Sequence, residues 1–394
     1  MSEYLTFQWI SLYVFIGILV ALVLKHKDKM ELQKMFFPVL YVGIFRTGFG
    51  IKLMKHLGTK YRTAVRMFGW CGIGMGVIGM AIICFSLIFS TIQNFLNPAL
   101  PAGVQPVLPN MTVPGFGFIP FWYWIIALFV IVLIHEFAHG IVAKAHGVKI
   151  KSSGVGFMAF FLPIVPLAFV EPDEKALAKE PDHVKHSIYA AGVFSNLVSA
   201  LAIFLIWMFI LVPVTANITN TDGVVFTKLS DEYPAWELPD DLVIREVNGV
   251  ATLDGESLLG ELNKLEIGDE VTLSDGVDSH TITTAESPEG GRAFLGITSI
   301  TTHMVKKDSV NQGFFAIFGW FAGLLVMIGK FSLAIGLANL LPIGPFDGGQ
   351  MLRTYLLSSF DGNKEKATKW LLYSSAFFGF LLIFGLGFWV KSLF

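Results

Sequence analysis

Six segments of the chain are apolar over a length that crosses a lipid bilayer, and this pattern limits the possible folds more than any other feature. The hydrocarbon core of a bilayer is about 30 Å thick, so a spanning helix needs about 20 mostly apolar residues. The chain is 54% hydrophobic and 15% charged, which excludes a disordered chain, a basic nucleic-acid-binding protein and a single soluble globule. We therefore expect a polytopic α-helical membrane protein with about six transmembrane helices. The six segments are residues 7–24, 67–92, 119–145, 188–212, 314–341 and 370–390.

Charge is distributed unevenly along the chain. Residues 215–310 carry 18 acidic and 6 basic side chains, whereas the rest of the chain carries 12 acidic and 22 basic side chains. The basic residues concentrate in three connections, at 25–66, 149–185 and 353–369. Lys and Arg accumulate on the cytoplasmic side of membrane proteins, and with six spans these three connections share one side. We expect a multi-pass protein of the cell membrane, with both termini and the acidic segment outside the cytoplasm.

Two other apolar runs are poorly suited to cross the bilayer as straight helices. Residues 35–44 are too few, so we expect this run at the membrane interface or against the helix bundle. Residues 154–170 are interrupted by Pro163 and Pro166. They predict either a hairpin or re-entrant loop at membrane depth, or a membrane-surface anchor.

An ionisable cluster lies within the third apolar segment, which contains IIALFVIVLIHEFAHGIVAKA. A helix turns once in 3.6 residues, so His135 and His139 lie on one face, one turn apart, where two imidazoles can share a metal ion. Glu136 lies beside them, as a base that could take a proton from metal-bound water. Ionised groups inside a bilayer cost roughly 2.5–3.5 kcal/mol each, so packing alone explains all three poorly. The pattern predicts a metal site within the membrane.

Two histidines leave such a site incomplete, because a catalytic zinc ion usually has three protein ligands and one open position. Asp347 follows the fifth apolar segment in ANLLPIGPFDGGQ, where Pro and Gly end the helix and let the chain fold back. Taken alone, Asp347-Gly348 would be an ordinary turn. Together with the histidines, which the expected topology places at a similar depth, we predict Asp347 as the third ligand.

Further polar and small residues lie inside the apolar segments. In the fourth segment Gly192 would permit close backbone approach, and Asn196 could hydrogen-bond a peptide or an oxyanion. The alternative for both is helix packing with one interhelical hydrogen bond. Lys330, in the fifth segment, is expected to snorkel or to pair within the bundle rather than to act in catalysis.

With these motifs together, the chain resembles the site-2 protease family of intramembrane zinc metalloproteases, and it looks closest to prokaryotic, archaeal-type members. The resemblance covers about residues 119–355. The matching motifs are HEFAH at 135–139, Gly192-x-x-x-Asn196 and Asn339-x-x-Pro342-x-x-x-x-Asp347-Gly348.

The resemblance implies a role for each matching polar residue. Zinc would be bound by His135, His139 and Asp347. Glu136 would activate water, and Asn196 and Asn339 would help to hold or polarise the substrate. Since no ligand position departs from the family pattern, the resemblance implies an active enzyme that cleaves transmembrane segments of other proteins.

The acidic segment reads as a small α+β module. Strands are predicted at 224–227, 242–247, 270–273 and 280–284, and a short helix at 258–265. Residues 241–249 and 267–273 resemble a PDZ domain, a module that binds peptides by strand addition. The alternative is a rigid extracytoplasmic cap without a peptide ligand.

The sequence thus predicts five parts: a transmembrane pair with a basic cytoplasmic loop (1–118), a first part of the catalytic core (119–213), the PDZ-like module (214–310), a second part of the core (311–355) and a C-terminal helix (356–394). The predicted function is hydrolysis of membrane-protein substrates by an intramembrane zinc metalloprotease, with the active site towards the cytoplasm. One edge of a hairpin at 154–170 could pair with unwound substrate. Expected partners are the lipid bilayer, a transmembrane substrate and a peptide ligand of the module, but no nucleic acid.

Two other functions compete with this prediction. A membrane-anchored peptidase that cuts soluble proteins would carry its H-E-x-x-H motif outside the bilayer, not in an apolar segment. A non-enzymatic scaffold or transporter with a peptide-binding module would not need Glu136 beside the two histidines.

Overall fold

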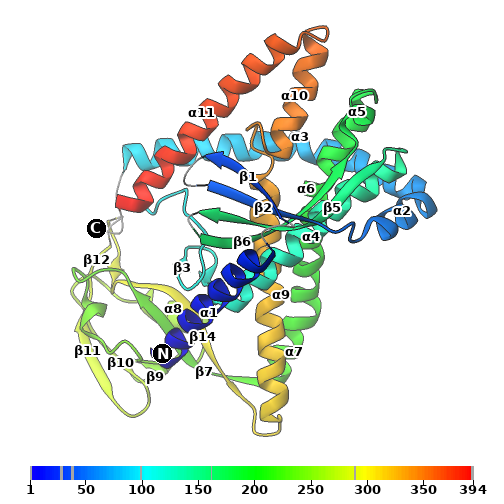
Figure 1. Cartoon of the computed structure of the whole chain (residues 1–394). Coiled ribbons are helices and arrows are strands. Elements are labelled where there is room, and N and C mark those ends of the chain that lie inside the picture. The colour runs from blue at the N-terminus through cyan, green and yellow to red at the C-terminus, as the bar shows by residue number, and fades with distance from the viewer. Residues whose placement is uncertain are drawn as a thin grey trace. The chain divides into compact units, whose positions relative to one another are not determined.

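The computed structural model describes residues 2–26, 30–36, 40–97, 100–160, 162–287 and 290–391 (Figure 1). The chain divides into two compact units. The first, here called the membrane unit, comprises Met1–Trp207 and Ala322–Phe394. The second, here called the β-rich unit, is Met208–Phe321 and includes residues 214–310, whose likeness to a PDZ domain stays a prediction.

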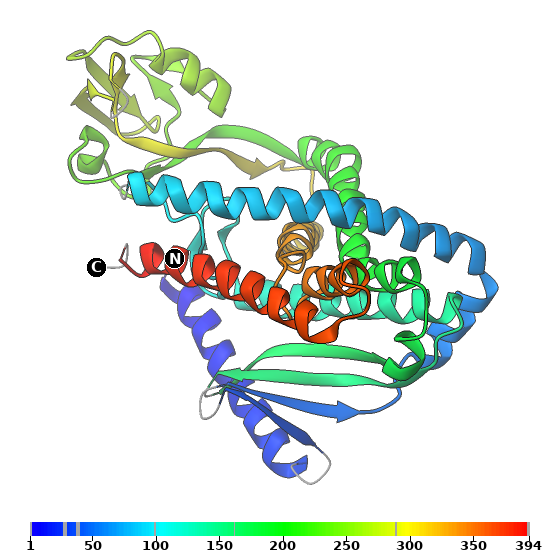
Figure 2. The ribbon, with the colours of Figure 1, turned by 90° about the horizontal axis from the view of Figure 1, so that it is seen from above.

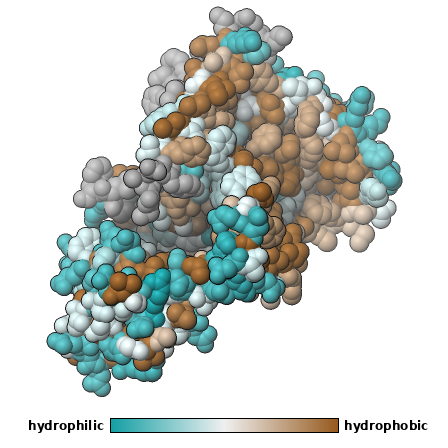
Figure 3. Space-filling model, turned by 90° about the horizontal axis from the view of Figure 1, so that it is seen from below, coloured by the Kyte–Doolittle hydropathy of each residue, from teal (hydrophilic) through white to brown (hydrophobic). Residues whose placement is uncertain are grey.

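In the described part of the chain, six helices are long and apolar enough to cross a membrane, which confirms the expected number. Many of their large side chains are exposed, such as Phe85 (69%) and Ile383 (73%), and Figure 3 shows hydrophobic residues gathered over the helices. Such a surface suits lipid better than water. The six helices are α1 (Ser2–His26), α3 (Arg62–Leu96), α4 (Phe121–Ala145), α6 (Asp182–Ile206), α9 (Gln312–Ala338) and α11 (Lys364–Lys391).

Two of these helices differ in extent from the prediction. α6 continues through a π-helical turn, Trp207–Leu211, into α7 (Val212–Ile218), so this apolar helix is longer than expected. α9 ends at Ala338, three residues before the predicted end at Leu341, because the chain turns there towards α10 (Asp347–Ser359).

Glycines allow the helices of the membrane unit to approach closely. A Cβ atom at Gly72 of α3 would lie 3.2 Å from Phe194 Cβ of α6. A Cβ atom at Gly58 of α2 (Ile51–Lys60) would lie 2.6 Å from the Ile141 carbonyl oxygen of α4. In lipid, small residues of this kind support helix association by close packing. α4 therefore contacts α2, α3 and α6 together.

A four-stranded antiparallel sheet packs against α4 through its edge strand β6. Figure 2 shows the sheet along one side of α4 and α3 along the other. Apart from residue 161, which lies outside the described residues, the run 154–170 forms most of the β5–β6 hairpin. The predicted hairpin is therefore present, and its depth in the membrane stays a prediction. The run 35–44 lies in β1 and β2, apart from residues 37–39, which fall outside the described residues. The strands, in sheet order, are β1 (Glu31–Phe36), β2 (Leu40–Arg46), β5 (Ile150–Phe160) and β6 (Leu162–Pro172).

Lys330 pairs within the bundle, as expected. Its Nζ donates hydrogen bonds to the carbonyl oxygens of Gly115 (3.0 Å) and Phe116 (3.1 Å). Both lie in the turn between the short strands β3 (Thr112–Val113) and β4 (Gly117–Phe118), which precede α4. The ammonium group is thus satisfied by backbone, away from the histidine cluster. One further short helix, α5 (Glu174–Leu177), follows β6.

The β-rich unit has its own core, in which Ile244, Leu258, Val271 and Leu273 are fully buried. Its main sheet has the order β11-β10-β8-β9, and β7 pairs with β14, and β12 with β13. The predicted helix is present as α8 (Gly255–Leu262), whereas the predicted strand 242–247 is a strand only at β8, with an isolated bridge at Ile244. The strands are β7 (Thr219–Lys228), β8 (Glu246–Val247), β9 (Val250–Ala251), β10 (Glu270–Ser274), β11 (Ser279–Thr283), β12 (Ala285–Glu286), β13 (Ala293–Phe294) and β14 (Ile297–Lys306), and Pro234–Glu237 is a 3₁₀ helix.

Candidate metal centre

Two histidines on one face of α4 begin the candidate site. The spacing of four residues brings His135 Nε2 and His139 Nε2 within 3.1 Å of each other. Both side chains are buried, with residue exposures of 7% and 8%. Glu136 follows His135 on the neighbouring face of the same helix and is half-buried.

Asp347 reaches the histidines because the connection from α9 to α10 is very tight. The N–H of Gly348 donates to the Asn339 carbonyl oxygen at 2.8 Å, which draws the start of α10 back to the end of α9. A Cβ atom at Gly348 would lie 2.1 Å from the Leu340 carbonyl oxygen, so only glycine fits this approach. As a result, Asp347 Oδ2 lies 3.0 Å from His135 Nε2, and Asp347 Oδ1 lies 3.4 Å from His139 Nε2.

These three side chains fit a tetrahedral metal ion. A zinc ion with ligands at about 2.0–2.1 Å holds neighbouring ligand atoms about 3.3 Å apart, close to the separations seen here. Asp347 Oδ2 is buried and makes no hydrogen bond, although it lies 3.0 Å from His135 Nε2. An unpartnered buried carboxylate oxygen is costly unless a cation binds it. Among the described residues, this is the one cluster of three such side chains with ligand atoms all within 4.8 Å.

A backbone carbonyl fixes the tautomer of His139. Nδ1 of His139 lies 2.7 Å from the carbonyl oxygen of Ile188 in α6. A carbonyl oxygen can only accept, so Nδ1 carries the proton and Nε2 presents its lone pair to the cluster. Such a contact behind a histidine ligand orients the ring and raises its basicity.

Asn196 of α6 lies behind the other histidine. Its side-chain amide, fully buried, lies 3.3 Å (Nδ2) from His135 Nδ1, and its Oδ1 has no hydrogen-bond partner. Rotating the amide by 180° exchanges Nδ2 and Oδ1, so that Oδ1 accepts a hydrogen bond from the Nδ1–H of His135. The Nε2 of His135 is then free to bind a metal ion. The predicted interhelical hydrogen bond is therefore present, and its partner is a candidate ligand.

Gly192 of α6 closes one side of the cluster. A Cβ atom at this position would lie 2.3 Å from His139 Nε2 and 2.6 Å from His135 Nε2. The side chain of any other residue would occupy the space in front of both ligand nitrogens. The close approach predicted for Gly192 is thus made to the two candidate ligands.

Glu136 faces the sheet. Its Oε2 accepts a hydrogen bond of 2.9 Å from the backbone N–H of Val170 in β6. A Cβ atom at Gly140, one turn further along α4, would lie 3.1 Å from Val170 Cγ1, so glycine there admits the strand. β6 therefore runs directly beside the candidate base.

The structure brings together six of the residues predicted from the sequence: His135, Glu136, His139, Gly192, Asn196 and Asp347. Asn339 contributes its backbone carbonyl to the tight connection before Asp347. The Ile188 carbonyl and the Val170 N–H were not predicted. Backbone groups carry no residue-specific signal in a sequence, so only the fold could reveal them.

Comparisons with known proteins agree with this site. The model of peptidase family M50 matches residues 123–383, from α4 into α11. The chain is 28% identical over 320 residues to the uncharacterized protein MJ0971 of Methanocaldococcus jannaschii, covering 78% of this chain and 75% of that protein. It is 24% identical over 229 residues to a membrane-bound transcription factor site-2 protease homolog of Arabidopsis thaliana, covering 57% of this chain and 37% of that protein. Since the family model spans more than half of its length and includes every candidate metal ligand, the chain belongs to peptidase family M50, the family of the site-2 proteases.

Proposed function

We propose that this metalloprotease uses zinc to hydrolyse peptide bonds within or near transmembrane segments of membrane-protein substrates. The observation that carries the proposal is the meeting of His135, His139 and Asp347 at 3.0–3.4 Å, with both histidines inside the apolar helix α4 and next to Glu136. A peptidase that acted only on soluble chains would have no need of a cluster buried among membrane helices.

Two histidines and one carboxylate are a donor set that suits zinc and leaves a fourth position open. When bound, zinc lowers the pKa of a water molecule and polarises a substrate carbonyl group. The chain's own residues orient the donors: the Ile188 carbonyl holds His139, and Asn196 holds His135. Gly192 keeps the space beside the donor nitrogens free.

Glu136 is the proposed general base. Glu136 lies between His135 and His139 in the chain. It takes the proton from water and later gives it to the leaving amine. Asn196 and Asn339 are proposed to help hold or polarise the substrate. For Asn196 the contact with His135 Nδ1 supports a positioning role as well, because the amide is already directed at a candidate ligand.

The free edge of β6 is the proposed docking site for an unwound substrate segment. Val170 pairs opposite Ser153, whose carbonyl oxygen bonds to Thr47 and Gly48 on the other side, so the N–H of Val170 points away from the sheet. By alternation the N–H of Ala168 points the same way. A substrate strand added here would lie beside Glu136 with its carbonyl groups released from helical hydrogen bonds.

The orientation in the membrane is proposed from the charge pattern. The basic connections would lie in the cytoplasm, the active site would face that side, and both termini and the β-rich unit would lie outside. The β-rich unit is proposed to bind peptides as a PDZ-like module. Its strands β7–β14 and helix α8 enclose a core of their own.

The decisive experiment compares wild type with E136Q and D347N in a membrane reporter whose transmembrane segment is cleaved. E136Q should lose at least about a hundredfold in rate, the scale of general-base catalysis, while retaining one metal ion per chain. D347N should lose both activity and metal. Normal cleavage by E136Q would disprove the base, and metal-free wild type would disprove the site.

A further inference from the structure

Two arginines meet at the end of the active-site helix. Arg62 and Arg66 lie one turn apart on α3, and the Nε–H of each donates to the Ala145 carbonyl oxygen, at 2.9 and 3.0 Å. A cation is favoured at a helix C-terminus, so this contact accounts for one N–H of each guanidinium. Each group has further N–H donors. Within the described part of the chain, neither arginine forms an ion pair with a carboxylate.

A third cation lies at the junction of α2 and α3. The Nζ of Lys60 lies 5.2 Å from the centroid of the Tyr61 ring, and it too has no ion pair among the described residues. Burial, together with Arg66, His183 and Arg62, lowers the pKa of His146 to about 4. Among the residues that the structure describes, no carboxylate pairs with Lys60, Arg62 or Arg66.

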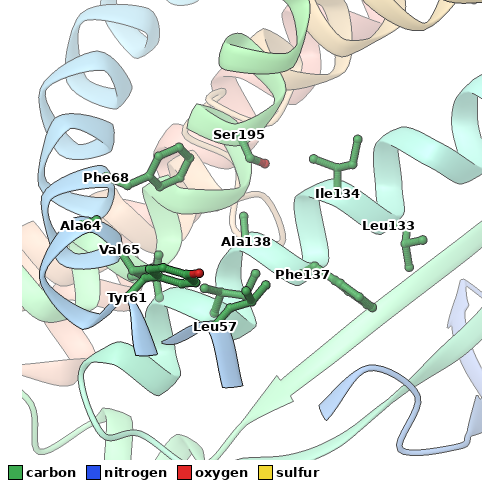
Figure 4. Close-up of a pocket in the computed structure, with 12 residues that line it drawn as sticks. Leu57, Tyr61, Ala64, Val65, Phe68, Leu133, Ile134, Phe137, Ala138 and Ser195 are labelled. Atoms are coloured by element: carbon green, nitrogen blue, oxygen red, sulfur yellow. The ribbon is translucent and has the colours of Figure 1, made fainter. Parts of the chain in front are cut away.

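An apolar cavity lies close to this helix end: its lining residue Ile141 precedes Ala145 by one turn of α4. It has a volume of about 550 Å³ and lies between α2, α3 and α4, with Ser195 of α6 at its far side (Figure 4). Tyr61 and Ile141 line it near the cations, and Phe68 and Leu133 line it deeper in the bundle. From Ile141 to Leu133 the cavity follows α4 for about 12 Å, at 1.5 Å per residue.

We propose that the three cations and this cavity bind one anionic phospholipid. Its phosphate would lie against Lys60, Arg62 and Arg66, and one acyl chain would enter the cavity along α4. The site matches a phospholipid in polarity. It has cations at one end, where the headgroup would lie, and apolar side chains along the cavity, where the acyl chain would lie. Anionic lipids of the cytoplasmic leaflet attract basic segments next to the membrane, and residues 25–66 are the most basic connection of the chain.

The cavity is too small to enclose a whole substrate helix. A helix about 10 Å wide that crosses about 30 Å of hydrocarbon fills roughly 2,400 Å³, several times the cavity. A volume of 550 Å³ falls within the range of about 300–1,000 Å³ that small ligands occupy. The occupant would pack against Ile134 and Phe137, on the opposite side of α4 from Glu136.

The test measures lipid binding to the full chain by native mass spectrometry, with phosphatidylglycerol and phosphatidylcholine as probes. Wild type should prefer phosphatidylglycerol at least tenfold. The variant K60Q/R62Q/R66Q should reduce this preference to less than twofold. The matched control K364Q/K366Q/K369Q removes the same charge from α11 and should keep the preference.

A second variant tests the cavity. A64F places a ring in it without changing charge, and should weaken binding of both lipids at least fivefold while leaving their ratio unchanged. The proposal is wrong if wild type shows no headgroup preference, if the α11 control loses it equally, or if A64F binds both lipids as wild type does. Slower reporter cleavage by K60Q/R62Q/R66Q without any lipid preference in wild type would assign this surface to the substrate instead.

Discussion

Glu136 Oε2 accepts a hydrogen bond from the Val170 N–H at 2.9 Å, so the candidate base and the edge strand β6 are joined by one contact. The N–H that a substrate strand would need is therefore the one that Glu136 already holds. Strand addition at this position would release the carboxylate from β6 as the substrate docks. Docking and activation of the base would then be coupled through a single backbone donor.

Proline substitutions on β6 test this coupling. V170P and A168P each remove one outward N–H, and proline is tolerated sterically on an edge strand. Each should lower kcat/KM for the transmembrane reporter at least tenfold without changing metal content. A loss of this size matches a hydrogen bond to a charged group, which contributes about 1.5–3 kcal/mol. V170T and A168S keep the N–H groups and should remain within about twofold of wild type. Unchanged turnover in both proline variants would remove strand pairing from the mechanism.

G192A should abolish metal binding. The added methyl group would lie 2.3 Å from His139 Nε2 and 2.6 Å from His135 Nε2, where no rotation can relieve the overlap. We expect metal content below a tenth of that of wild type, and no cleavage. G74A is the matched control: it adds the same methyl group to a helix, but nothing lies within 4 Å. It should keep metal and activity and be slightly more stable, by up to about 1 kcal/mol. A fully loaded G192A protein would show that the ion does not bind between these nitrogens.

N196A separates two roles for Asn196. If the amide orients His135, metal affinity should fall about 10- to 100-fold, the usual effect of removing a group behind a ligand. If it contacts only the reacting carbonyl, metal affinity should stay constant and kcat should fall at saturating metal. The contact of 3.3 Å with His135 Nδ1 leads us to expect the loss of affinity. Metal titration followed by reporter kinetics at saturating zinc measures both quantities.

The pH dependence of the β-rich unit should reveal the Asp222–Arg245 pair. The hydrogen bond from Arg245, whose Nη2 lies 2.7 Å from Asp222 Oδ2, holds the pKa of Asp222 below its usual range. Because the folded-state pKa is lowered, the pair stabilises the unit above about pH 4 and loses this effect as the pH falls through the folded pKa.

D222N should therefore increase hydrogen exchange in β7 at pH 7, relative to wild type. The difference should disappear at about pH 2–3, after correction for intrinsic exchange rates. An equal difference at both pH values would mean that the substitution acts through packing and not through charge.

The candidate ligands and the candidate base could be predicted from sequence because local spacing determines them. His135 and His139 must share a helix face, and the tight Pro- and Gly-rich connection before Asp347 implied a chain reversal. The common depth of Gly192 and Asn196 followed from counting spans. These predictions required only helical periodicity and a consistent number of membrane crossings.

The sheet could not be predicted in the same way. The register that pairs β2 with β5 joins residues more than 100 positions apart, and nothing in the run 35–44 specifies that partner. The pairing depends on glycine: a Cβ atom at Gly156 would lie 2.3 Å from the Gly43 carbonyl oxygen. The position of Val170 beside Glu136 follows from this long-range assembly, so it was beyond the reach of local patterns.

The prolines of β6 have a consequence for how this protein behaves at high concentration. Between Pro166 and Pro172, which carry no N–H, the outward-facing donors are those of Ala168 and Val170, and Glu136 occupies the latter. This stretch of the strand therefore offers a second copy of the chain a single unoccupied donor. Edge-to-edge growth into intermolecular sheets gains little from so short a match. Extracted protein should accordingly resist β-type aggregation along this stretch.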